Sequence, residues 1–442
     1  MMCKGRLLLL FLLLTLLGIG SCTPKMERYF VQAEDVVFFS ARESKAKSIR
    51  INGQEIRMNL LQNGACHQYE NYIPDQQYPN HSPVYQLRVN FHFIDHGEGG
   101  YNYEPAAARK MVASLLNSAN HDLKKNNANW LPYQNDYPVL PVGYEMVLQS
   151  QAEDPSDDGI YFHQTGEEAF YVHKGRNQNI HHREVIRDFA IGSDSIMNIF
   201  IMPHHPDSVL SPTYHVGMVG VYLGRAIKMA GMYELNEPGW AYRGVLNHEM
   251  GHALGLRHAW MADGCTDTPT HNNPCWSRSK EPPCDTAASN NVMDYNALQN
   301  AYTPCQVGRI RLQLAKAGQS TRGYLVPHWN QLDTNRTILI RDSIVWAGAK
   351  DLRGNLIIAP GAKLKVNCRL GMPLGSHILI KAGGTLILED AQLHHPEGRK
   401  WQGIQIEKTR KKKGYLRIGG NTQVLDAVHP LPTAAVNPGQ TD

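Results

Sequence analysis

The sequence predicts an α+β fold in two parts, and three observations support this prediction. Between residues 86 and 202, stretches with the period of a strand lie before and after a stretch with the period of a helix. Residues 246–258 form a second helical stretch that carries three histidines. After Pro327 the helical periodicity ends, and short apolar runs recur around glycines. We therefore expect a domain with a twisted mixed sheet and helices, followed by an all-β domain.

Length and charge limit the broad class of protein. The chain has 442 residues, and a single hydrophobic core rarely grows past about 250–300 residues, so we expect more than one domain. The formal net charge is +4. A charge this small for the length argues against nucleic acid as a main partner.

The N-terminus is typical of an export signal. Lys4 and Arg6 precede an apolar run at 7–17, which is too short for a comfortable membrane span. A small-residue pair directly before Cys22 resembles the bacterial lipobox. Residues 1–21 are therefore predicted to be a lipoprotein-type signal peptide, with Cys22 as the lipidated residue that anchors the chain to a membrane. The alternative is an ordinary cleaved signal. In the first case the protein is a cell-envelope lipoprotein of the outer membrane or cell surface, and in the second it is secreted.

Residues 22–83 are predicted to be a pro-segment or an N-terminal extension, with a short strand at 36–39. Cys66 in this segment has three interpretations. Its thiolate blocks the open position of a metal site, it is the disulfide partner of Cys368, or it is a buried thiol.

Residues 84–327 are expected to form the first domain. Its first strand is predicted at 86–93, where apolar and polar residues alternate. The helix that follows has one apolar face, formed by Ala108, Met111, Val112, Leu115, Leu116 and Ala119. Further strands are predicted at 142–148 and 195–202. A strand at 217–223 is expected at the edge of the sheet, where an extended peptide can pair with it.

The second helical stretch indicates a zinc site. His248 and His252 are one helical turn apart, so both imidazoles can reach one ion, and Glu249 leans toward the same side. Gly255 suits the left-handed position that ends a helix, and the chain reversal can bring His258 in as a third ligand. Three protein ligands leave one tetrahedral position open for water. This is typical of a catalytic zinc site rather than a structural one.

The pattern His-Glu-x-x-His-x-x-Gly-x-x-His with a later methionine resembles the metzincin clan of zinc peptidases. The segment from about Gly244 to Leu314 is most similar to the pappalysin and cytophagalysin group, peptidase family M43. This resemblance implies that Met293 forms the Met-turn below the metal, that Glu249 is the general base, and that Tyr295 donates a hydroxyl hydrogen bond to the oxyanion. The alternative role of Tyr295 is packing only.

The resemblance implies an endopeptidase that binds one zinc ion and hydrolyses protein or peptide substrates with a zinc-activated water. Two other function classes remain open. One is a metal-bound but inactive adhesion protein whose C-terminal domain contacts glycan or matrix, and the other is a zinc hydrolase of a non-peptide amide. The presence of Glu249 beside an intact ligand set argues against the inactive protein. Asp267 and Thr268 resemble a calcium-holding segment of some relatives, but no dense acidic cluster supports Ca²⁺ here.

Four cysteines cluster after the zinc helix, namely Cys265, Cys275, Cys284 and Cys305. In an exported protein they predict two disulfides, and three connectivities are open. A second zinc site is the alternative, which the lack of a Cys-x-x-Cys pair disfavours. The last cysteine lies in a helix that is predicted to begin with a capping box at Thr303 and Gln306 and to end near Ala317.

Residues 335–442 are predicted to form a β-rich repeat domain. The segment 354–366 is echoed by 376–388, each with two short strands around a glycine corner, and a looser third copy runs over 404–425. Such repeats favour a short parallel β-solenoid, whose coils bury a shared core only by stacking. A small β-sandwich is the alternative. The basic run at 408–413 is interpreted as a solvated loop, and contact with an anionic surface is the alternative.

Overall fold

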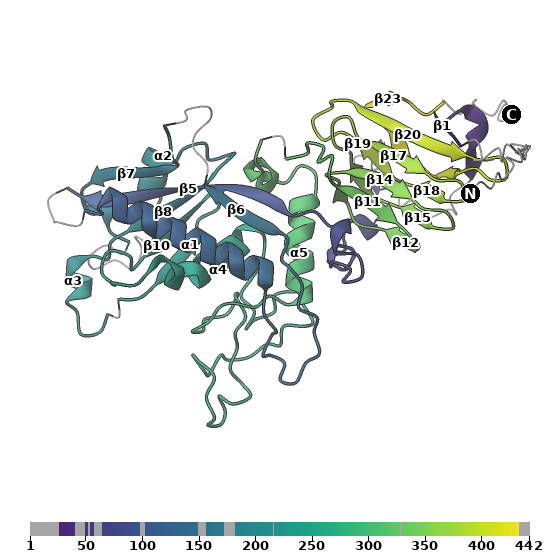
Figure 1. Cartoon of the computed structure of the whole chain (residues 1–442). Helices are drawn as coiled ribbons and strands as arrows, with labels where there is room; N and C mark the ends of the chain where they lie inside the picture. Colours follow the sequence, from purple (N-terminus) through teal and green to yellow (C-terminus); the bar gives the residue numbers. More distant parts are fainter. Residues whose placement is uncertain are drawn as a thin grey trace, which may run out of the picture.

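The computed structural model shows two bodies, a mixed α/β domain and an all-β domain (Figure 1). It describes residues 26–39, 49–51, 54–56, 64–97, 102–148, 156–171, 182–214, 216–327 and 329–432. The predicted signal peptide and Cys22 lie outside these described residues. Among the described residues, none of the helices combines the length and apolar character that crossing a lipid bilayer requires.

The first domain contains a six-stranded sheet with the order β6-β5-β8-β10-β9, and β7 also pairs with β5. Its strands are β5 (Tyr85–His96), β6 (Tyr144–Leu148), β7 (Ile160–Thr165), β8 (Met197–Met202), β9 (Val219–Tyr222) and β10 (Ala226–Ala230). All pairs are parallel except β9 with β10. Strand β9 lies at the edge, where the sequence predicts it. Strands β7 and β10 were not predicted from the sequence. In β10 the buried Lys228 interrupts the run of apolar residues that would have indicated a strand.

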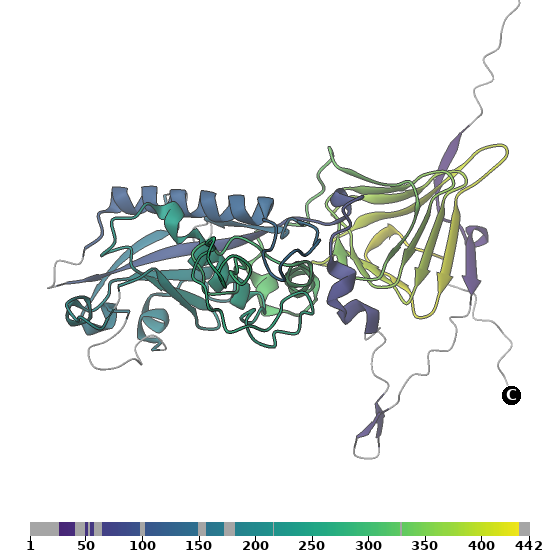
Figure 2. The same ribbon diagram turned by 90° about the horizontal axis from the view of Figure 1, so that it is seen from below.

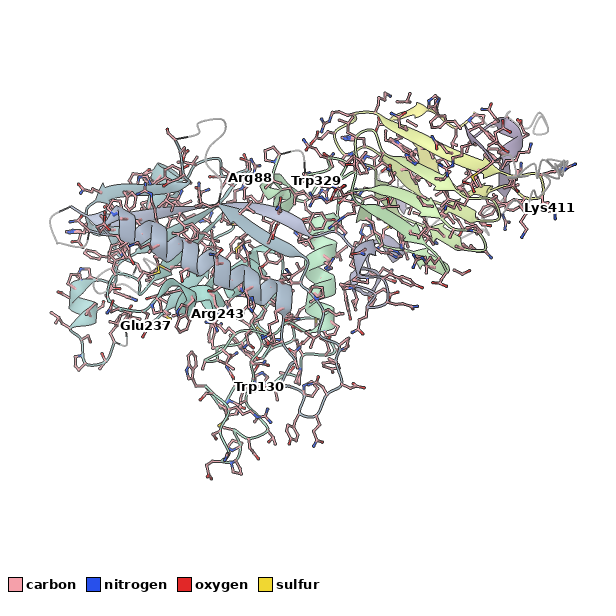
Figure 3. The ribbon with its side chains drawn as sticks, in the orientation of Figure 1. Arg88, Trp130, Glu237, Arg243, Trp329 and Lys411 are labelled. Atoms are coloured by element: carbon pink, nitrogen blue, oxygen red, sulfur yellow. A yellow bond between two sulfur atoms is a disulfide. The ribbon has the colours of Figure 1, made fainter. Side chains whose placement is uncertain are left out.

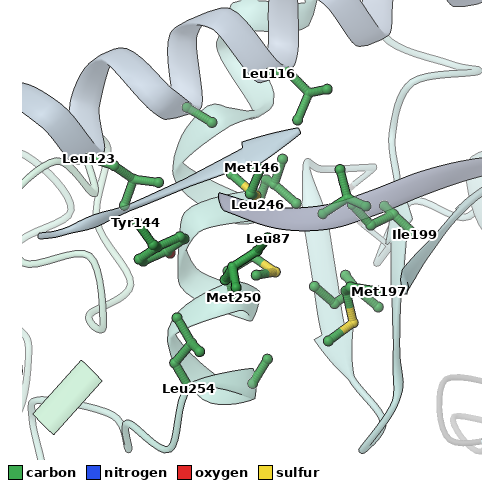
Figure 4. Close-up of a cluster of buried hydrophobic side chains, with 14 of the residues drawn as sticks. Leu87, Leu116, Leu123, Tyr144, Met146, Met197, Ile199, Leu246, Met250 and Leu254 are labelled. Carbon is green, nitrogen blue, oxygen red and sulfur yellow. The ribbon is translucent and has the colours of Figure 1, made fainter. Parts of the chain in front are cut away.

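Helix α1 (Pro105–Lys125) runs along one face of the sheet, and α4 (Arg243–Ala253) contributes to the same core (Figures 1 and 2). Figure 4 shows Leu116 of α1 and Leu246 and Met250 of α4 in one cluster with Leu87 of β5. The apolar face predicted for α1 is buried, apart from the partly covered Met111. This packing fixes α4, and therefore its histidines, against the sheet.

Helix α5 (Pro304–Ala315) closes the first domain with the predicted capping box. The Thr303 hydroxyl accepts a hydrogen bond from the Gln306 backbone N–H, and the Gln306 side chain accepts one from the Thr303 N–H. The short helices α2 (Glu184–Phe189) and α3 (Pro206–Val209) complete the α-helices of the described chain, which also contains short 3-10 helices.

The all-β domain is a parallel β-solenoid, which confirms the predicted fold and excludes the sandwich. Its coils form three sheets with the orders β11-β14-β17-β20, β12-β15-β18-β21 and β13-β16-β19-β22. In the first sheet Leu356, Ile378 and Ile404 stack in register, as apolar residues do in a shared core. The first sheet consists of β11 (Thr337–Ile340), β14 (Asn355–Ile358), β17 (His377–Ile380) and β20 (Trp401–Lys408), with β23 (Ala427–His429) beside β20. The second consists of β12 (Ser343–Trp346), β15 (Lys363–Val366), β18 (Thr385–Glu389) and β21 (Tyr415–Gly419), and the third of β13 (Lys350–Asp351), β16 (Arg369–Gly371), β19 (Gln392–His394) and β22 (Gln423–Val424).

Two details of the repeat prediction are wrong. The second strand of the third copy is β21, not residues 424–425, because Leu416 stacks on Leu386 while Val424 stacks on Leu393 of the third sheet. Each coil also has a third, very short strand, and a further coil formed by β11, β12 and β13 precedes the predicted ones. Strands of two or three residues are too short to show an alternating pattern in the sequence.

The N-terminal residues are part of the solenoid sheets. Strand β1 (Glu27–Phe30) pairs antiparallel with β20, and β2 (Val36–Phe39) pairs parallel with β21. They cover the outer edges of the last complete coil, which would otherwise present unpaired backbone groups. The segment from 22 to 83, expected as a pro-segment or extension, therefore supplies two strands to the C-terminal domain. A separate hairpin joins β3 (Ile49–Ile51) and β4 (Gln54–Ile56).

A buried ionic cluster joins the two domains at Asp351 of β13. Its carboxylate accepts hydrogen bonds from Arg369, from Arg322 Nη1 at 3.0 Å and from the Tyr85 hydroxyl at 2.9 Å. Burial raises the pKa of Asp351, but the two guanidinium groups outweigh this effect and hold the net pKa well below its usual range.

A disulfide between Cys66 and Cys368 lies beside this junction. Of the three interpretations of Cys66, the structure thus shows the pairing with Cys368. A bonded sulfur is not a thiolate ligand, so in this state Cys66 does not block the zinc site.

Replacing Asp351 with Ala should lower the free energy of unfolding by about 3–5 kcal/mol, because it leaves two buried guanidinium groups without their anion. Denaturant titration of both proteins measures this difference. The control is Asp333→Ala in the connection just before the solenoid, which removes an exposed pair with Arg336 and should cost at most about 1 kcal/mol. Equal effects of the two variants would contradict a stabilising role for the buried cluster.

Candidate metal centre

Three histidine nitrogens converge at the C-terminal end of α4. The Nε2 atom of His252 lies 3.1 Å from Nε2 of His248 and 3.1 Å from Nε2 of His258. These are the three residues that the sequence predicts as ligands, and together they form a group that can hold one metal ion.

Backbone carbonyls fix the proton on the far side of two of these rings. His248 Nδ1 lies 2.7 Å from the Val292 carbonyl oxygen, and His252 Nδ1 lies 3.0 Å from that of Leu256. A carbonyl oxygen only accepts, so each Nδ1 carries the proton and each Nε2 keeps its lone pair. Two lone pairs that face each other at 3.1 Å repel unless a cation lies between them.

The donor set fits zinc. A tetrahedral zinc ion with Zn–N bonds of about 2.0–2.1 Å holds its ligand nitrogens roughly 3.3 Å apart. Burial, followed by the neighbouring imidazoles, lowers the pKa of His248 to about 3. The same two causes lower the pKa of His258 to about 4. Both rings are therefore neutral at neutral pH, as zinc ligands must be.

A Schellman motif ends α4 and brings His258 to the site. Gly255 adopts the left-handed conformation with φ +85°. Its N–H donates to the His252 carbonyl at 3.0 Å, and the Leu256 N–H donates to the Gly251 carbonyl at 2.9 Å. The predicted role of Gly255 as the helix terminator is confirmed. The reversal also supplies the Leu256 carbonyl that orients His252.

The buried Met293 lies below the histidines, where a Met-turn is expected. A Cβ on Gly251 would overlap the Met293 sulfur, so the helix and the methionine are in direct contact. The Ala259 N–H donates to the Met293 carbonyl at 3.0 Å. This bond ties the turn to the residue that follows His258.

Glu249 is buried between α4 and the edge strand β9. Its side chain faces Gly220, where a Cβ would come within 2.8 Å of the Glu249 Cγ. Burial raises the pKa of the carboxyl to about 7, although a hydrogen bond from the Tyr222 backbone N–H acts in the opposite direction. Because that bond and Gly220 position the group, Glu249 is held beside the ligands without being one of them.

Tyr295 lies over the ligand histidines with half of its side chain exposed. Its ring centroid is 5.3 Å from that of His258 and 5.7 Å from that of His248. Burial, together with the charge of Glu249, raises the pKa of the phenol. The hydroxyl is therefore protonated at neutral pH and can donate a hydrogen bond.

The structure adds neighbours of the site that the sequence reasoning missed. Trp260 stacks on His258 with ring centroids 4.0 Å apart, and it also contacts Tyr295. The buried Asp294 accepts from His271 Nε2 at 3.2 Å. Asp294 could have been predicted as a neighbour of the site because it directly follows Met293 in the sequence. Nothing in the sequence pattern indicates His271.

The four clustered cysteines form two disulfides, Cys265–Cys305 and Cys275–Cys284, as predicted. The structure selects this connectivity and leaves no thiolate in the cluster for a second zinc ion. Asp267 lies between the first pair and α5, where its carboxylate accepts from the Thr303 hydroxyl at 2.7 Å and from the Cys305 N–H at 2.8 Å. These bonds cap the N-terminus of α5, a function that needs no calcium.

Comparison with known proteins supports the same assignment. The profile of the family Peptidase M43, described as pregnancy-associated plasma protein-A, matches residues 186–315 and so includes all three histidines, Glu249 and Met293. The first domain is an M43-like metzincin metallopeptidase domain. Among curated proteins, no match to the chain was found.

This M43-like chain is also similar to 45 chains of solved structures. Mature mirolysin from Tannerella forsythia in complex with a cleaved peptide is 19% identical, with a TM-score of 0.37, over 55% of this chain and 97% of that chain. Mirolysin in complex with compound 9 is 18% identical, with a TM-score of 0.38 and the same coverage. A Tannerella forsythia promirolysin mutant is 18% identical, with a TM-score of 0.37, over 55% of this chain and 84% of that chain.

Replacing Gly220 with Ala should lower peptide hydrolysis on the order of 10²-fold, because the added Cβ displaces the Glu249 side chain while the histidines keep zinc. Turnover and metal content measure the two effects separately. Gly97→Ala in the same domain is the control, since an added Cβ at this exposed glycine would meet no other atom within 4 Å. Wild-type turnover of Gly220→Ala would show that the edge strand does not position Glu249.

Proposed function

We propose that this metallopeptidase is a zinc-dependent endopeptidase in which Glu249 is the general base and Tyr295 supports the oxyanion. The observation that carries the proposal is the arrangement around the three ligands. A buried carboxylate on the same helix as two of the ligands lies beside them, and a protonated phenol has its ring centroid 5.3 Å from that of His258 and 5.7 Å from that of His248. General base catalysis with oxyanion stabilisation requires these two groups.

The residues of the chain divide the reaction between them. His248, His252 and His258 would hold the ion, which when bound supplies Lewis-acid polarisation of a water and of the scissile carbonyl. Glu249 takes the proton from the attacking water on its carboxylate and then delivers it to the leaving amine. The hydroxyl of Tyr295 donates a hydrogen bond to the oxygen on which negative charge develops.

The edge strand β9 supports a peptide as the substrate. It pairs on one side with β10, and no other strand of the described residues pairs with its outer side. Glu249 contacts this strand through Gly220 and the Tyr222 N–H. An extended peptide that adds to β9 through backbone hydrogen bonds would therefore run past the general base.

Replacing Glu249 with Ala should lower peptide hydrolysis by roughly 10²–10⁴-fold while zinc stays stoichiometric, because the carboxylate acts on the water and not on the metal. Tyr295→Phe should lower turnover by roughly 10–10³-fold, also with zinc retained. His258→Ala should lose zinc as well as activity, because it removes a ligand. Metal analysis measures how much zinc each variant retains, and digestion of a peptide library measures its peptide hydrolysis.

The control variant is Glu237→Ala, which removes an exposed carboxylate of the same domain and should change neither property. Substantial hydrolysis by zinc-loaded Glu249→Ala would refute the general-base assignment. Cleavage restricted to a non-peptide amide in the wild type would instead point to a hydrolase of another class.

We also propose that the chain is exported and anchored through a lipid on Cys22. The Cys22→Ser protein should then be released from the membranes of a bacterial host by a high-salt wash, while the wild-type protein stays in the membrane fraction. Both proteins should hydrolyse the same peptides, because residue 22 is not part of the metal centre. If the two proteins are released equally by the wash, the lipid anchor is excluded.

A further inference from the structure

The turn between β20 and β21 concentrates positive charge at one corner of the solenoid. We name residues 408–413 the tip hairpin. The Thr409 N–H donates to the Lys412 carbonyl at 2.8 Å and closes the turn. Arg410, Lys411 and Lys412 are exposed, and within the described part of the chain none of these three side chains forms an ion pair.

The acids at the base of the tip hairpin do not neutralise these three cations. Asp35 is buried and pairs with Lys413 at 2.8 Å. Glu407 is buried and pairs with Arg28 at 3.2 Å. Each of these two acids therefore has its own cation. The exposed Glu27, opposite Lys408, and Glu34 are also near the base of the hairpin, but within the described part of the chain neither forms an ion pair with residues 410–412. The charge of the outer part of the hairpin can therefore attract an anionic surface.

Apolar side chains lie beside this charge. Val37 and Phe38 of β2 are each 52% exposed, and Tyr415, which follows the hairpin, is 46% exposed. In the β2–β21 register Val37 is opposite Arg417, so it lies on the same outward face as Tyr415, whereas Phe38 is opposite Ile418 and faces the other side. This pairing and the Asp35–Lys413 ion pair hold Val37 and Tyr415 near the hairpin. A basic group with adjacent exposed aromatic residues is the composition that binds the interface of a bilayer.

The tip hairpin also lies close to the predicted anchor. Figure 3 places Lys411 at the end of the solenoid that is remote from the metallopeptidase domain. Glu27, the first residue of β1, is opposite Lys408 in the β1–β20 register. Cys22 precedes Met26, the first described residue, by four positions in the sequence. A lipid on Cys22 would therefore bring this corner to the membrane.

We propose that the tip hairpin, with Tyr415 and Val37, docks on the anionic phospholipid headgroups of a bilayer and holds the metallopeptidase domain away from it. Each basic side chain near such a surface strengthens binding about fivefold, so three contribute on the order of 100-fold. The inference depends neither on the peptidase activity nor on acylation of Cys22.

The test uses the full chain with Cys22→Ser, which cannot be acylated, and sedimentation with vesicles of phosphatidylcholine with or without phosphatidylglycerol. The protein should bind only the anionic vesicles at about 0.1 M salt and dissociate as salt is added. Replacing Arg410, Lys411 and Lys412 together with Ala should weaken binding on the order of 100-fold. Tyr415→Ala should weaken it several-fold.

The matched control replaces Lys110, Lys124 and Lys125 of α1 with Ala, which removes the same charge from the other domain and should leave binding unchanged. Unchanged peptide hydrolysis and thermal unfolding show that each variant is folded. Equal loss of binding in both triple variants would overturn the proposal, because net charge alone would then explain it. Absence of binding to anionic vesicles, or binding of short duplex DNA in place of vesicles through the same residues, would also overturn it.

Discussion

The metal centre depends on two hydrogen bonds that place ligand imidazoles against backbone carbonyls. His248 donates to Val292 and His252 donates to Leu256, so each ring presents an unprotonated Nε2 to the same point. Both carbonyls belong to segments that must themselves be placed correctly, namely the Met-turn and the reversal after α4. The ligands therefore orient the two segments, and the two segments orient the ligands. This mutual dependence explains why the Schellman motif and the Met293–Ala259 bond are part of the site and not only of the fold.

The sheet edge adds the catalytic part to this metal-binding part. Helix α4 buries Leu246 and Met250 in the domain core, and this packing turns Glu249 toward β9. Glycine is required at 220 because a larger residue would occupy the space of the Glu249 side chain. The same strand supplies the N–H that holds the carboxylate and an open edge for an extended peptide. One edge strand thus positions the base and the proposed substrate against each other, which keeps their separation independent of loop conformation.

The sequence was sufficient where the determining residues are close together along the chain. The spacing of His248, His252 and His258, the turn at Gly255, and the capping box of α5 are local, and all lie as predicted. It was insufficient where partners are far apart. The pairing of Cys66 with Cys368 spans 302 residues, and the strands β1 and β2 pair with coils that come near the end of the chain. No local pattern marks such partners, because the three-dimensional fold alone brings them together.

These long-range contacts also set how the two domains depend on each other. The last complete coil of the solenoid has β1 and β2 on its edges, so cleavage that removed residues 26–39 would expose the backbone groups of β20 and β21. The Cys66–Cys368 disulfide and the Asp351 cluster attach the solenoid to the metallopeptidase domain at the opposite corner of the coils. Two main-chain connections, residues 40–84 and residues 327–335, therefore cross the junction, and the disulfide ties the first of them to the solenoid. Moving one domain against the other would separate Asp351 of the solenoid from Arg322 and Tyr85 of the first domain. Separating a buried ion pair is strongly destabilising, so the ionic cluster favours one fixed arrangement of the domains over a hinge.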